Sequence, residues 1–113
     1  MTVSSHYSKT NAQIGLLNYQ GLLLSLEELS ILKEKGSKDY PIKLNRIKKR
    51  INKLREVHTT DSVKNIFNYD INFKFAEEVV QEIENSLIDV SGLGKKIFPV
   101  LDDIRSLFPR HYN

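Results

Sequence analysis

Hydrophobic positions recur every three or four residues along four stretches of the chain, the spacing that places side chains on one face of an α-helix. In the first stretch they wrap most of the helix circumference: Ile14, Leu16, Leu17, Tyr19, Leu22, Leu23, Leu24, Leu26, Leu29, Ile31 and Leu32. A helix that is apolar nearly all round is central to its fold or lies partly in an interface. We therefore expect this segment to be the central helix.

Capping residues and helix breakers set the expected ends of the helices. Thr10-Asn11-Ala12-Gln13 matches a capping box, and Gly36 suits the position after a helix end, so the first helix is expected over 11–35. Pro41 suits the first turn of a second helix. Ser91-Gly92-Leu93-Gly94 is read as a helix stop, and Pro99 as part of the first turn of the last helix. The expected helices are 11–35, 41–57, 75–90 and 97–108, with a short one at 61–67.

One stretch follows a different period. From Asn68 to Phe75, polar and apolar residues alternate strictly, which is the pattern of a half-buried strand. The helical phase of the residues before it does not continue into the apolar residues after it. We therefore expect a break over 68–74, and 69–74 is the one place where a strand is compatible with the pattern.

Together these elements predict an all-α fold, an antiparallel bundle of four main helices plus one short helix. A chain of 113 residues with 40% hydrophobic and 27% charged residues has the size and composition of one globular domain. We assign 1–9 to a flexible arm, 10–108 to the bundle and 109–113 to a tail. Because three modest neighbours cannot cover the first helix, a homodimer is also expected.

The segment 42–55, IKLNRIKKRINKLR, contains seven cations and no acid. Its apolar residues form one seam, which predicts that Leu44, Ile47, Ile51 and Leu54 are buried. The opposite side carries the cations that we expect to be exposed, and these are the candidate binding residues, with Arg50 beside them: Arg46, Lys49, Arg50 and Lys53. Such a face suits phosphates, but it has no aromatic residue for base stacking. The acidic segment 75–90 offers the flanking cations an intramolecular partner, so a solvated or intramolecularly paired face is the favoured interpretation, ahead of nucleic acid and of an acidic protein or membrane surface.

Residues typical of catalysis and metal binding are sparse. There is no cysteine, and the three histidines lack the spacing of a helical metal site: His6, His58 and His111. Glu78 and Glu82 are expected on a solvated face, and Asp102-Asp103 early in the last helix, where acids suit its dipole. We predict no enzyme, metal or cofactor. No stretch is apolar enough to span a membrane and no signal peptide begins the chain, so a cytoplasmic location is expected.

In size, basic charge, helix count and lack of cysteine the chain resembles the pediocin-type bacteriocin immunity proteins. This resemblance implies a four-helix bundle that acts by binding other proteins, and it rests on no shared motif. Arg105 and His111 resemble the Arg-x(4–6)-His motif of HEPN-type ribonucleases, but Pro109 would end a helix between them. We predict a non-catalytic regulatory, immunity- or antitoxin-type protein that binds a protein partner, with nucleic-acid binding through 42–55 as the alternative.

Overall fold

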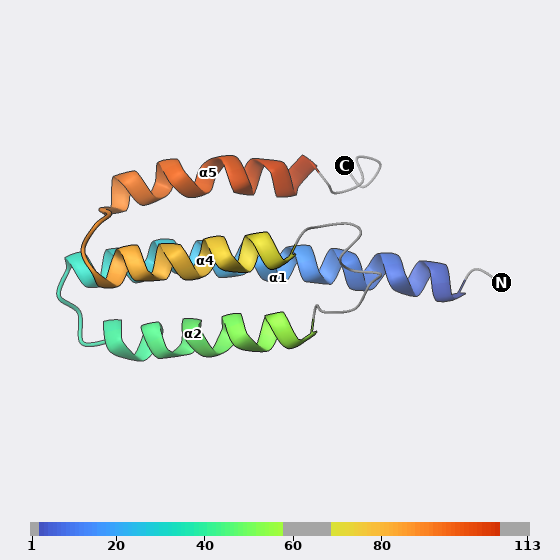
Figure 1. The fold of residues 1–113 in the computed structure, drawn as a ribbon, viewed down its shortest axis with the longest axis horizontal. Helices are drawn as coiled ribbons and strands as arrows, with labels where there is room; N and C mark the ends of the chain where they lie inside the picture. The colour runs from blue at the N-terminus through green and yellow to red at the C-terminus, as the bar shows by residue number, and fades with distance from the viewer. Residues whose placement is uncertain (1–2, 58–68, 107–113) are drawn as a thin grey trace.

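The computed structural model describes residues 3–57 and 69–106, with side chains described for 15–56 and 71–106. Four α-helices occupy this part of the chain: α1 (Val3–Glu34), α2 (Tyr40–Val57), α4 (Tyr69–Glu84) and α5 (Val90–Ser106). Each helix runs antiparallel to the one before it, and no strand occurs in the described ranges (Figure 1). The predicted all-α antiparallel bundle is confirmed, whereas the short helix at 61–67 lies outside the described residues.

Helix α1 is the centre of the bundle, as its apolar circumference predicted. It packs against α2, α4 and α5. Its start corrects the prediction, because α1 begins at Val3, and residues 3–9 of the expected flexible arm are helical. The capping box at Thr10 therefore lies inside a helix. Neither glycine nor proline interrupts residues 3–13, so the helix can extend through them. At the other end, Gly36 has a φ of 64° and ends the helix as expected.

Helix α4 overturns the tolerated strand at 69–74 and, from residue 69 onward, the expected break over 68–74, of which residue 68 lies outside the described residues. The helix begins at Tyr69, and Phe73 is fully buried, in helical phase with Ala76, Val80 and Ile83. Ile71, which alternation would place on the same face as Phe73, is 64% exposed. Polar residues at every second position gave this segment the sequence pattern of a strand. Phe73 is nevertheless the first residue of the buried face of a helix.

The connection between α4 and α5 also differs from the prediction, which ended one helix at 90 and began the next at 97. Helix α4 ends at Glu84, where Ser86 takes up a left-handed φ of 55°. The Asp89 side chain accepts a hydrogen bond from the Gly92 backbone N–H at 2.7 Å and so caps the start of α5. The predicted stop at residues 91–94 is the first turn of α5, and Pro99 lies in the middle of that helix.

Among the residues whose side chains are described, the buried hydrophobic residues form one cluster to which all four helices contribute. In α2, the predicted seam faces it: Ile47, Ile51 and Leu54 are buried, and Leu44 is partly buried. Tyr19 from α1 meets Phe73 from α4 edge to face, with ring centroids 5.9 Å apart. None of the helices in the described ranges is long and apolar enough to cross a membrane.

Candidate binding surface on the basic helix

Some of the seven cations of 42–55 contact other helices of the bundle, and the others face outward. Lys48 pairs with Glu84 at 3.1 Å, and Arg55 pairs with Glu77, so both join α2 to α4. On the other edge, Lys43 pairs with Glu28 of α1 at 2.6 Å. The expected pairing of the basic helix with the acidic helix is therefore confirmed by the two α2–α4 pairs.

Arg50, one of the four candidate binding residues, points toward α1 instead of outward. Its guanidinium donates hydrogen bonds to the Asn18 carbonyl oxygen at 3.3 Å and the Ser25 hydroxyl at 3.4 Å. A Cβ added at Gly21 would lie 3.0 Å from Nη2 of Arg50. The glycine thus leaves room for the arginine to cross α1, and Arg50 holds the two helices together.

The other three candidates share the outward face of α2. Arg46, Lys49 and Lys53 are exposed, as predicted, and no ion pair joins them to any other side chain within 15–56 or 71–106. They follow one another at spacings of three and four residues, so they line one side of the helix. Within 15–56 and 71–106, the acids of α1 and α4 that pair with α2 do so with the cations at its edges: Glu28, Glu77 and Glu84.

Ile42 extends the same row and was not among the predicted site residues. It lies four residues before Arg46 and is 54% exposed. The signal was present in the sequence, because Ile42 falls outside the seam that contains Leu44 and Ile47. The outward face of α2 therefore combines one isoleucine with three cations. We call Ile42, Arg46, Lys49 and Lys53 the α2 outer face.

A recess adjoins this face where α2 meets α1. It has a volume of about 220 Å³ and is lined by Ser25, Lys43, Arg46, Ile47 and Arg50. Arg46 thus belongs both to the outer face and to the recess. Three of the five lining residues are cations, so this is a place where an acidic group would be attracted.

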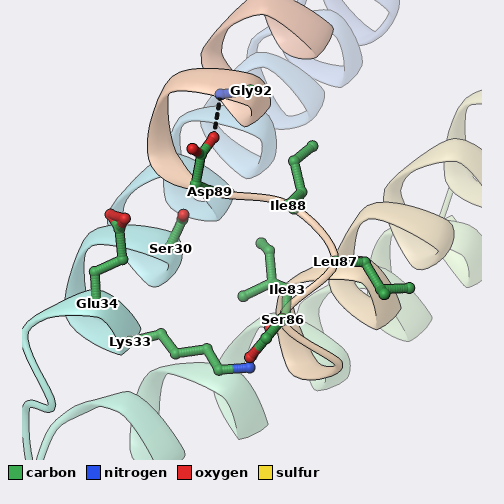
Figure 2. Close-up of a pocket in the computed structure, with 9 residues that line it drawn as sticks. All are labelled: Ser30, Lys33, Glu34, Ile83, Ser86, Leu87, Ile88, Asp89 and Gly92. Atoms are coloured by element: carbon green, nitrogen blue, oxygen red, sulfur yellow. Dashed lines mark hydrogen bonds between the residues drawn. The ribbon is translucent and has the colours of Figure 1, made fainter.

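A larger cavity of about 640 Å³ lies at one end of the bundle, beside the α4–α5 connection (Figure 2). Two of its charged residues, Lys33 and Asp89, have structural roles. Lys33 of α1 donates hydrogen bonds to the carbonyl oxygens of Ile83 and Glu84, at the C-terminus of α4, the second at 2.6 Å. Asp89 caps the N-terminus of α5. The Lys33 contacts tie α1 to α4 at this end of the bundle, and the Asp89 contact stabilises the start of α5.

The remaining candidates from the sequence do not converge on one site. Glu78 is exposed, and Glu82 pairs with Lys96 of α5. Because α5 begins at Val90, Asp102 and Asp103 lie in its second half and not in its first turns. In the described part of the chain no three His, Cys, Asp or Glu residues are grouped as metal ligands. His58 and His111 lie outside the described residues, as does the side chain of His6.

Two tyrosines have raised pKa values for structural reasons. Burial raises the pKa of Tyr19, whose hydroxyl also donates to the Asn72 carbonyl oxygen at 2.6 Å. For Tyr40, burial is again the main cause of the raised pKa, and the Glu84 carboxylate adds to it while Lys48 opposes it. Both raised values favour neutral phenols within the packed bundle.

No family model, curated protein or solved structure matches this chain. The α2 outer face is therefore interpreted from its own chemistry.

Proposed function

We propose that this chain is a non-catalytic regulatory protein, of the immunity or antitoxin kind, that binds an acidic surface of a protein partner through the α2 outer face. The observation that carries the proposal is the row Arg46, Lys49 and Lys53, which forms no ion pair within 15–56 or 71–106 although the other cations of the helix are engaged. Desolvating cations costs free energy unless a partner supplies the opposite charge, so an acidic partner fits this row.

Ile42 favours a protein over a nucleic acid as that partner. Its exposed side chain lies in line with the cations, so any surface that covers the row also covers an apolar group. A protein surface offers apolar area to match it, whereas a phosphate backbone offers oxygens. The recess beside Arg46 adds a position for one acidic side chain of the partner, between Lys43 and Arg50.

Nucleic-acid binding is the second candidate, and it rests on the same three cations. Asn45 and Asn52 are exposed on the same helix and can hydrogen-bond to phosphates or base edges. Such binding would be weakly sequence-specific. It would also weaken steeply with salt, because each neutralised phosphate releases counterions.

A matched set of three baits tests the proposal in lysate from the native organism. The first is the wild type, the second carries Arg46→Glu, Lys49→Glu and Lys53→Glu, and the third carries Lys35→Glu, Lys74→Glu and Lys95→Glu. All six residues are exposed, and both triple variants change the net charge by the same six units, from +3 to −3. Only the position of the charge therefore differs between them.

We expect a protein that is retained by the wild type and the control triple, lost from the α2 triple, and unaffected by nuclease treatment. If nuclease releases it, or if a gel shift at low salt shows binding of duplex or single-stranded nucleic acid that the α2 triple abolishes, the second candidate is correct. Equal retention on all three baits in nuclease-treated lysate would refute a role for the α2 outer face.

A further inference from the structure

Helix α1 carries a row of exposed hydrophobic residues on the face that its neighbours leave open. Leu17, Leu24 and Ile31 are 54%, 45% and 38% exposed, and they follow one another at intervals of seven residues. A spacing of seven places them within about 40° of one another around a helix. The rest of the α1 circumference packs against α2, α4 and α5.

The charges along α1 are distributed unequally about Leu24. All its acids lie on the C-terminal side: Glu27, Glu28 and Glu34. From Val3 to Leu26 the only charged residue, with histidine neutral, is Lys9. One half of the helix is therefore acidic and the other half is free of acids.

This asymmetry distinguishes the two ways in which a second α1 can lie against the first. In a parallel pair the acidic half of each helix lies beside the acidic half of the other, and like charges repel, less so at Glu28 because it pairs with Lys43 of its own chain. In an antiparallel pair the acidic half of each helix faces the acid-free half of the other, and the helix dipoles oppose each other as well. With Leu24 at the centre, Gln20 lies opposite Glu28, so an amide donor lies beside the Lys43–Glu28 ion pair.

We propose that the chain forms a homodimer in which two α1 helices pack antiparallel through Leu17, Leu24 and Ile31. Leu24 lies on the twofold axis and meets its own copy, and Ile31 of each protomer meets Leu17 of the other. The row is self-complementary because its outer members are equally distant from Leu24, as a twofold interface requires. This interface goes beyond the proposed function, since it uses α1 and leaves the α2 outer face free.

Light scattering coupled to size-exclusion chromatography tests whether the dimer exists. The wild type should have the mass of two 13.1 kDa chains at about 100 µM, and Leu24→Glu should have the mass of one. Leu87→Glu is the control, since Leu87 is 73% exposed in the α4–α5 connection and outside the row. Circular dichroism checks that each variant retains its helices. A monomeric wild type at that concentration, or a dimeric Leu24→Glu, would refute the interface.

Disulfide formation tests the orientation, and the chain has no cysteine of its own to interfere. Leu24→Cys should oxidise to a covalent dimer. Leu17→Cys alone should not, because fourteen residues of rise place the two sulfurs on the order of 21 Å apart, beyond disulfide reach. Mixing Leu17→Cys with Ile31→Cys should restore a covalent dimer of one copy of each. Efficient self-linking of Leu17→Cys would instead show a parallel pair and contradict the proposal.

Discussion

Replacing Tyr19 by phenylalanine removes one hydroxyl from the centre of the bundle and keeps the ring that packs against Phe73. The hydroxyl donates to the Asn72 carbonyl oxygen at 2.6 Å, across the contact between α1 and α4. A buried hydrogen bond of this kind contributes about 0.5–1.5 kcal/mol to stability. We expect Tyr19→Phe to lower the free energy of unfolding by about 1 kcal/mol at pH 7, measured by urea denaturation.

At alkaline pH the same substitution removes a loss of stability that affects the wild type alone. Burial raises the pKa of Tyr19 in the folded state above its ordinary value of 10.0, so its contribution to stability is complete below pH 10. At higher pH the unfolded chain ionises this tyrosine while the folded chain does not, which costs the wild type roughly 1.4 kcal/mol by pH 11. The phenylalanine variant has no such loss. Its deficit should therefore disappear near pH 11.

Denaturation of both proteins at pH 7, 9, 10 and 11 measures the two effects together. The difference between the proteins isolates Tyr19, because every other titrating group is common to both. A difference that is constant from pH 7 to 11 would refute the buried environment derived for Tyr19. A deficit above about 3 kcal/mol at pH 7 would show that more than one hydrogen bond depends on the hydroxyl.

Three further substitutions test the corrected parts of the fold. Ser86→Gly should raise the free energy of unfolding by about 0.5–1 kcal/mol in thermal or urea denaturation, because Ser86 holds a left-handed φ that glycine adopts without strain; a destabilised variant would contradict this turn. Phe73→Ala should cost about 3–5 kcal/mol and Ile71→Ala less than about 0.5, since one side chain is buried and the other exposed. Similar losses for the two would instead indicate a strand, in which both share a face.

The helix faces were predictable from the sequence wherever one apolar seam dominated. In α2, the helical spacing of three and four residues predicts that Ile47 and Ile51 lie on one side of the helix and Arg46 and Lys49 on the other. The structure places each residue on the expected side. The edges of that helix were predictable too, because Lys48 and Arg55 flank the seam and the acidic helix supplies Glu84 and Glu77.

The helix boundaries were less predictable because local signals competed with tertiary packing. Gly92 and Gly94 read as a helix stop, yet burial of Leu93 and the Asp89 cap favour a helix through both glycines. At the start of α4, alternation over a few residues outweighed the buried phase that begins with Phe73. The burial of that phenylalanine against Tyr19 of α1 is a long-range contact that no local pattern contains.

The candidate site was predictable in its cations and not in its neighbours. Periodicity identifies Arg46, Lys49 and Lys53 as exposed, but it cannot show that Arg50 reaches the Asn18 carbonyl on another helix. It also gives no volume to the recess beside Arg46, which exists only once α1 and α2 have packed together.

The effect of Ile42→Ser on the affinity for the captured partner tests the proposed function most directly. This change leaves every charge in place and removes the apolar group that distinguishes a protein surface from a phosphate backbone. Fully burying an isoleucine contributes about 1.5–3 kcal/mol, and Ile42 is 54% exposed in the free chain, so about half of that is available on binding. Isothermal calorimetry should therefore show a Kd weakened about four- to twelvefold. An unchanged Kd for Ile42→Ser, beside a large loss for the α2 triple, would show that charge alone holds the partner and would contradict the account.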